Sequence, residues 1–274
     1  MQLNDCTGGA DSIHKRCKFD AASAESYSVN MMRFYLYQWW SMIYEEDSLI
    51  LISDFRDVFF QSNPFDYKRE TWGPPNYQLV VFLEAFPNKM IYRCPHNSGW
   101  INSCYGPDAL SMVSDNMVSC SGITMGTRDA MLIYAYLMTQ QLDPKVRFTR
   151  NGLDLKVDSS QIPTDNKKCS ANGVDQGFHN FLLYSGQLDK VMDIKIFPQG
   201  EGPVNTVGAF NGDQALVKKN LYEWKVLRGD APNQMFYNWN GDPSPAIHQY
   251  DRYMKSHFNF QYEKYLYALK DSMQ

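Results

Sequence analysis

The sequence predicts an α/β fold in which a mixed, mainly parallel central sheet is flanked by helices. Residues 48–53 (SLILIS) and 78–84 (QLVVFLE) are continuous apolar runs, as expected for strands that are buried on both faces of such a sheet. Before the first run, apolar residues recur at three- and four-residue steps from Ser26 to Ile43, which indicates an amphipathic helix. The alternation of helix, strand and loop is typical of a single α/β domain.

The remaining segments continue this alternation. Thr127 is expected to cap a helix, because threonine before an apolar periodic stretch commonly accepts a hydrogen bond from the first turn. The first segment, residues 1–24, shows little periodicity and is expected to be an irregular lead-in within one domain spanning residues 1–274. We expect strand or loop at 117–125, helices at 127–141, 175–184 and about 250–269, and strands at 191–197, 204–210 and 222–227, with residues 88–107 forming a long loop.

Composition limits the classes of partner. The net charge is −4 and lysines and arginines are scattered, so the chain has no basic surface signature for nucleic acid. The longest apolar runs fall far short of the roughly 20 residues that span a bilayer, so no membrane segment is expected. Six cysteines show no metal-binding spacing; a Cys94–Cys104 disulfide and buried free thiols are both open. Golgi lumen and cytoplasm both remain open as the compartment.

Asp54 and Asp57 directly follow the first predicted strand, where open α/β sheets bind ligands. On a continuing strand their side chains would point to opposite faces, but a turn after Asp54 would bring both carboxylates to one side. Oxygen ligands of this kind suit Mg²⁺ or Mn²⁺, which also coordinate phosphate oxygens. The alternative is a pair of solvated aspartates with Arg56 as an internal salt-bridge partner.

Residues 54–65 (DFRDVFFQSNPF) resemble a metal-binding motif of GT-A glycosyltransferases, in a variant of D-x-D written D-x-R-D-v-x-F-Q-x-x-P-F. Four further blocks follow in the order and spacing of that family, over about residues 30–255. They are NSGWINSCYG from Asn97, CSGITMG from Cys120, VDQGFHN from Val174 and PAIHQYDR from Pro245. Five blocks in sequence are a far more specific signal than a single D-x-x-D.

The resemblance implies a GT-A (Rossmann-like) fold and a metal-dependent hexosyl- or pentosyltransferase. Such an enzyme moves a sugar from a nucleoside diphosphate sugar, with UDP or GDP, to a hydroxyl of a glycan or glycoprotein. The strand–helix–strand units that bind the base in this family precede the D-x-D strand, and here they are expected to be shortened or missing. The implied metal ligands for Mn²⁺ (or Mg²⁺) are Asp54, Asp57 and His248; the implied donor-site residues also include Arg56, Ser121 and Gly122; the implied catalytic residues are Asp175, Gln176 and Glu84.

Each of these roles has a structural alternative. Asp175 either assists the acceptor hydroxyl, or stabilises positive charge on the sugar, or is a helix N-cap. His248 is either a ligand or a strand histidine in a local polar network, and Glu84 is either catalytic or an ordinary strand-end acid. Trp100 and Tyr105 either stack against an acceptor sugar or belong to the core.

At the level of the whole protein, two other functions remain open. One is a non-catalytic, carbohydrate-binding relative of the GT-A fold. The other is a metal-dependent phosphohydrolase, although DFRDV lacks the D-x-D-x-[TV] arrangement that those enzymes require.

Overall fold

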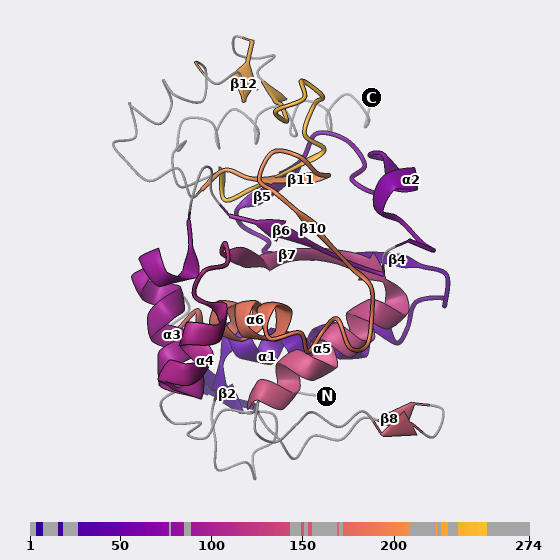
Figure 1. Ribbon diagram of the computed structural model, residues 1–274. Helices are drawn as coiled ribbons and strands as arrows, with labels where there is room; N and C mark the ends of the chain where they lie inside the picture. The colour runs from indigo at the N-terminus through magenta and orange to yellow at the C-terminus, as the bar shows by residue number, and fades with distance from the viewer. Residues whose placement is uncertain are drawn as a thin grey trace.

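The computed structural model describes residues 4–7, 16–18, 27–76, 78–84, 89–142, 149–150, 153–154, 169, 172–208, 223, 226–229 and 235–250. A four-stranded sheet lies between a layer of helices and a second, smaller sheet (Figure 1). The mixed α/β class predicted from the sequence is therefore confirmed. Within the described part of the chain, no helix has both the length and the apolar character needed to cross a bilayer.

The four-stranded sheet has the order β10-β6-β7-β4, and it is not the mainly parallel Rossmann-like sheet that we expected. Its strands are β4 (Leu49–Ser53), β6 (Leu79–Leu83), β7 (Ser119–Thr127) and β10 (Ile194–Phe197). Only β10 and β6 pair in parallel, whereas β7 is antiparallel to both β6 and β4. An apolar run signals burial but carries no strand direction, so the sequence did not reveal the reversed β7.

The burial of the strands follows their place in the sheet. In β6, Leu79 and Val81 join the core beneath the helices, while Val80 and Phe82 join a core on the opposite face. This alternation explains the continuous apolar run, because both faces of the strand are covered. In β4 only Ile52 is buried, because β4 is an edge strand; the prediction that β4 is buried on both faces was wrong.

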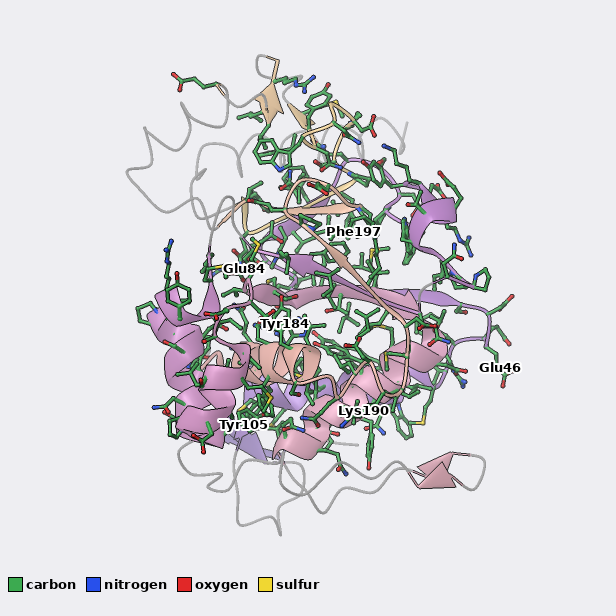
Figure 2. All side chains as sticks on the ribbon, in the orientation of Figure 1. Glu46, Glu84, Tyr105, Tyr184, Lys190 and Phe197 are labelled. Carbon is green, nitrogen blue, oxygen red and sulfur yellow. A yellow bond between two sulfur atoms is a disulfide. The ribbon has the colours of Figure 1, made fainter. Side chains whose placement is uncertain are left out.

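Three helices, α1 (Val29–Ser41), α5 (Arg128–Leu142) and α6 (Val174–Tyr184), cover one face of the sheet (Figure 1). The predicted cap of α5 is confirmed, since the Thr127 hydroxyl accepts a hydrogen bond from Ala130 N–H at 3.2 Å. Gly173 precedes α6 with φ +81°, a left-handed conformation that glycine adopts without steric cost. Phe197 lies on the other side of the sheet, away from these helices (Figure 2).

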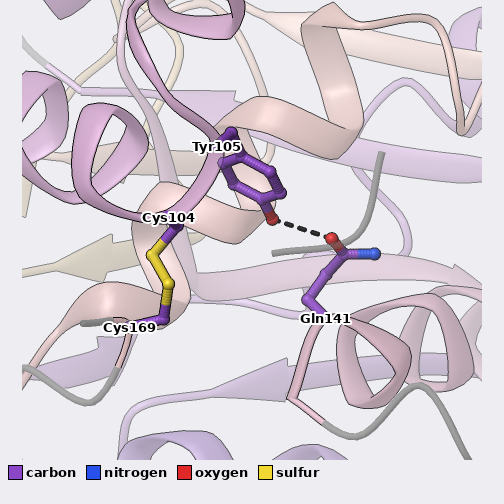
Figure 3. The surroundings of a disulfide bond; sticks show 4 residues. All are labelled: Cys104, Tyr105, Gln141 and Cys169. Atoms are coloured by element: carbon purple, nitrogen blue, oxygen red, sulfur yellow. Dashed lines mark hydrogen bonds between the residues drawn. A yellow bond between two sulfur atoms is a disulfide. The ribbon is translucent and has the colours of Figure 1, made fainter. Parts of the chain in front are cut away.

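Residues 88–107, expected as a loop, instead contain helix α3 (Pro95–Tyr105), which is followed by α4 (Pro107–Val113). Proline begins each helix, at a position where its missing N–H costs nothing. Cys104 of α3 forms a disulfide with Cys169, at a Cα–Cα distance of 5.2 Å (Figure 3). The proposed Cys94–Cys104 pair was therefore wrong: Cys94 is a buried free thiol just before α3.

The smaller sheet, of order β11-β14-β5, lies on the face of the larger sheet away from the helices (Figure 1). Its strands are β5 (Val58–Phe60), β11 (Val204–Thr206) and β14 (Ala246–His248), so it brings together residues that are far apart in the sequence. β14 is parallel to β11 and antiparallel to β5. Val58 pairs with His248, which places His248 beside the segment that follows β4.

The remaining elements are short. The lead-in expected to be irregular contains β1 and β2, because strands this short leave no periodic signal; they form an antiparallel sheet with β3. The strand expected at 222–227 and the helix expected at 250–269 fall largely outside the described residues. The short elements are β1 (Asn4–Thr7), β2 (Arg16–Lys18), β3 (Tyr27–Ser28), α2 (Arg69–Trp72), the 3-10 helix Ile91–Arg93, β8 (Thr149–Arg150), β9 (Leu153–Asp154), β12 (Leu227–Arg228) and β13 (Met235–Phe236).

Candidate metal centre

Asp54, Asp57 and His248 come together between the two sheets. One ligand atom from each residue lies within 4.8 Å of the others, as a shared ion requires. His248 Nε2 is 3.6 Å from Asp54 Oδ2 and 4.0 Å from Asp57 Oδ1. Asp57 and His248 are buried, while Asp54 has 35% of its side chain exposed, so the group opens to solvent on the Asp54 side.

A bend after β4 produces this convergence. The chain turns at residues 55–57 and enters β5, so the turn that the two carboxylates need is present. Two main-chain hydrogen bonds hold the bend: Asp54 N–H donates to Gly122 O at 2.6 Å, and Gln249 N–H donates to Asp57 O at 2.7 Å. Gln249 itself has φ 60°, an uncommon conformation for a residue other than glycine. The backbone around both aspartates is thus fixed by β7 and by the end of β14.

Two observations fit a cation at this position. His248 Nε2 is buried and makes no hydrogen bond, which is unusual for a polar atom in a protein interior. Gly122 lies directly against the group, because a Cβ there would be 2.5 Å from Asp54 Oδ2 and 2.9 Å from His248 Cε1. Because residue 122 is a glycine, no side chain of β7 takes up the space that these ligand atoms need.

The other ring nitrogen of His248 is oriented by a second layer of groups. Nδ1 lies 3.5 Å from Thr206 Oγ1 and 3.5 Å from Cys120 Sγ. Such contacts fix the ring so that Nε2 points toward the carboxylates, as is usual for histidines that bind metals. Burial raises the pKa of Cys120 well above its usual value, so this side chain is a neutral thiol.

Arg33 of α1 places a positive charge between the carboxylates of Asp54 and Asp175. Its Nη1 contacts Asp54 Oδ1 at 2.5 Å and its Nη2 contacts Asp175 Oδ2 at 2.6 Å. Burial alone would raise the pKa of Asp54, but the neighbouring His248 ring and the charge of Arg33 outweigh burial and lower this pKa to about 2. Asp54 is therefore ionised at any physiological pH, as a metal ligand must be.

Asp175 and Ser121 lie next to this group. Ser121 donates a hydrogen bond to Asp175 Oδ2 at 3.1 Å, and Asp175 is buried in the first turn of α6. Gly173, not Asp175, is the N-cap of α6, so the helix-cap alternative for Asp175 does not hold. Gln176 follows Asp175 and is half-buried.

Glu84 follows β6 at the left end of the strand as drawn in Figure 2. It is buried, pairs with Lys89 Nζ at 2.7 Å and accepts a hydrogen bond from Gln249 Nε2 at 3.4 Å. Burial would raise the pKa of Glu84, but the charge of Lys89 lowers it. Glu84 is not one of the three grouped ligands, although Gln249, which donates to it, directly follows His248 in the chain.

The aromatic residues suggested as an acceptor platform are part of the packing. Tyr105 stacks on Phe181 with ring centroids 3.8 Å apart and donates a hydrogen bond to Gln141 at 2.8 Å (Figure 3). Trp100 is half-buried against Gly173 and Gly177. The core alternative thus describes Tyr105. Within the bend, by contrast, the Phe55 side chain is fully exposed and Arg56 is exposed as well.

Sequence reasoning missed Arg33, although a signal was present. Arg33 lies between Met32 and Phe34 on the apolar face of a helix, where a charged residue is rarely buried without a partner. Asp54 and Asp175 are those partners.

Comparison with known proteins adds no family to this geometry: no protein-family model matches the chain, and no curated protein matches its sequence.

Proposed function

We propose that this protein is a metal-dependent glycosyltransferase. It would move a hexose or pentose from a UDP- or GDP-sugar to a hydroxyl group of a glycan or glycoprotein. The observation that carries the proposal is the convergence of Asp54, Asp57 and His248, with the unpartnered His248 Nε2 directed at the two carboxylates. The similarity of five sequence blocks to GT-A glycosyltransferases supports the same conclusion.

The donor set suits Mn²⁺, or Mg²⁺ as the second choice. Two carboxylates and one imidazole leave further coordination positions for diphosphate oxygens and water, and the imidazole favours Mn²⁺. When bound, the ion supplies Lewis-acid neutralisation of the charge that develops on the departing diphosphate. Ser121 and Gly122 of β7 border the group on one side, and Arg56 lies in the bend, where its charge can reach phosphate.

We assign Asp175 an electrostatic role. Its Oδ2 accepts hydrogen bonds from both Arg33 and Ser121, which hold the carboxylate in a fixed position. A fixed negative group at this position is suited to stabilise positive charge that builds on the transferring sugar. Gln176 lies beside it, and Glu84, engaged with Lys89, is a weaker candidate for a base.

The test is thermal unfolding with UDP, GDP, CMP and ADP, each with and without Mn²⁺. A ligand present at 100 times its Kd stabilises the folded state by about 2.7 kcal/mol. For a domain of this size that corresponds to a rise in melting temperature of roughly 5–10 °C. We expect one nucleotide to give this rise only with Mn²⁺, and we expect Asp57→Asn to abolish it.

Asp242→Asn is the matched control, because Asp242 is an exposed acid that pairs with Lys68 and lies outside the metal group. Slow Mn²⁺-dependent hydrolysis of the corresponding nucleotide sugar would separate an enzyme from a non-catalytic, carbohydrate-binding relative. If no nucleotide produces a Mn²⁺-dependent shift and no sugar is released, the enzymatic proposal fails and the carbohydrate-binding alternative replaces it.

A further inference from the structure

One buried guanidinium joins two carboxylates that come from distant parts of the chain. Arg33 leaves α1 on its buried side, and only 16% of its side chain is exposed. Its two terminal nitrogens contact different residues, Asp54 after β4 and Asp175 at the start of α6. The planar fork of arginine can hold two acceptors at once in fixed directions, which a lysine cannot do.

The contact with Arg33 determines which way the Asp54 carboxylate faces. Oδ1 receives the hydrogen bond from Arg33, so Oδ2 is turned toward His248, 3.6 Å from Nε2. With about a third of its side chain exposed, Asp54 would otherwise be free to rotate into solvent. Main-chain hydrogen bonds fix its backbone but do not set this rotation.

The same guanidinium also fixes Asp175. Oδ2 of Asp175 accepts hydrogen bonds from Arg33 and from Ser121, so this oxygen is anchored by both α1 and β7. Asp54 and Asp175 are both anionic side chains, and a single positive charge between them offsets their mutual repulsion. Arg33 is therefore the side chain that links the positions of the two carboxylates.

We propose that Arg33 is a positioning residue that aligns Asp54 for metal binding and fixes Asp175 at a set distance from the metal. The inference rests on the metal site assigned under the proposed function. It gives Arg33 a geometric role that goes beyond neutralising charge. Groups that orient metal ligands in this way typically contribute 10- to 100-fold to metal affinity.

Two substitutions distinguish geometry from charge. Arg33→Lys keeps the positive charge but loses the two-pronged contact, whereas Arg33→Gln loses both. A purely electrostatic role predicts unchanged Mn²⁺ affinity for Arg33→Lys and tighter binding for Arg33→Gln, because a repelling cation has been removed. A positioning role predicts that both variants bind Mn²⁺ at least tenfold more weakly.

The whole protein is titrated with Mn²⁺, and electron paramagnetic resonance measures the concentration of free Mn²⁺ at each step. This measurement of affinity does not depend on enzymatic activity. Arg128→Lys is the matched control, since Arg128 has the same 16% exposure but pairs with Asp129, away from the site. Circular dichroism confirms that each variant is folded. Should Arg33→Gln fail to fold because the buried Asp175 carboxylate loses its ion-pair partner, the Arg33→Lys titration decides alone.

Wild-type affinity retained in Arg33→Lys overturns the positioning role while leaving the metal site intact. If the wild-type protein binds no Mn²⁺, or if Asp57→Asn binds it equally well, the metal site and the proposed function fail together with this inference. The expected pattern is binding in wild type and Arg128→Lys, and at least tenfold weaker binding in both Arg33 variants.

Discussion

Gly122→Ala adds a single methyl group to the candidate metal centre without changing any charge or ligand. The new Cβ would lie 2.5 Å from Asp54 Oδ2, 2.9 Å from His248 Cε1 and 3.0 Å from His248 Nε2. Ordinary contacts of this kind are 3.4 Å or longer, so the carboxylate oxygen must move by about 1 Å. We expect the displacement to fall on these side chains because β7 is held by strands on both sides.

The displacement is large compared with what a metal site tolerates. Ligand distances in such sites vary by only about 0.2 Å, so a shift of about 1 Å removes Asp54 or His248 from coordination. We expect Mn²⁺ affinity to fall by at least tenfold, and stability to fall by about 1–3 kcal/mol from the added methyl group. Calorimetric titration with Mn²⁺ measures the first effect and thermal unfolding measures the second.

Gly99→Ala is the control, because no atom lies within 4 Å of a Cβ at Gly99, which is exposed on α3. There the same chemical change should raise stability by about 0.5–1 kcal/mol, as alanine favours helix over glycine, and leave Mn²⁺ binding unchanged. If Gly122→Ala binds Mn²⁺ within twofold of wild type, the ion does not lie between Asp54 and His248, and the site assignment is refuted.

Three further predictions concern stability. Cys104→Ser should lower the free energy of unfolding in denaturant by about 2–4 kcal/mol, because the disulfide to Cys169 closes a long loop. If the wild-type protein has the same denaturant midpoint with and without reductant, this prediction is contradicted. Burial lowers the pKa of His179 to about 3, below its value near 6.5 in the unfolded chain. Between these two pH values only the unfolded state binds the proton, so the free energy of unfolding should fall by up to about 1.4 kcal/mol per pH unit as the pH drops from 6.5 toward 3. His179→Gln should flatten this slope in acid unfolding. Tyr105→Phe removes the hydrogen bond to Gln141 and should cost about 1 kcal/mol in stability without changing the KM for acceptor, whereas a raised KM would favour the sugar-stacking role.

The parts of the fold that local patterns specify were predicted well. Local sequence patterns identified α1, α5 and α6, and Thr127 was identified as a cap from its residue type and its place before a helical stretch. The direction of β7 and the edge position of β4 depend on how distant segments pair, and no local pattern encodes that. Helix α3 was missed because the asparagines, serines and glycines between Pro95 and Pro107 are typical of loops.

The candidate site was likewise predicted only in part. From the spacing of Asp54 and Asp57 we predicted that a turn after Asp54 would bring both carboxylates to one side, and the bend supplies that turn. The likeness to GT-A enzymes contributed His248, which spacing alone would not have linked to residues almost 200 positions earlier. Arg33 was not predicted as a site residue because its partners, Asp54 and Asp175, belong to two other elements. A charged residue on the apolar face of a helix indicates only that it has some partner.

The position of β14 between β11 and β5 has a consequence for the order in which the protein can assemble. Two of the candidate ligands, Asp54 and Asp57, follow β4 early in the chain, but the third, His248, is in place only when its strand has been synthesised and has paired on both edges. Contacts this distant in sequence form late, because a long loop must close before they are gained. A nascent or truncated chain that ends before His248 would carry both aspartates yet lack a complete centre. Metal binding would then report that folding has been completed, and the ion would not be a template on which folding begins.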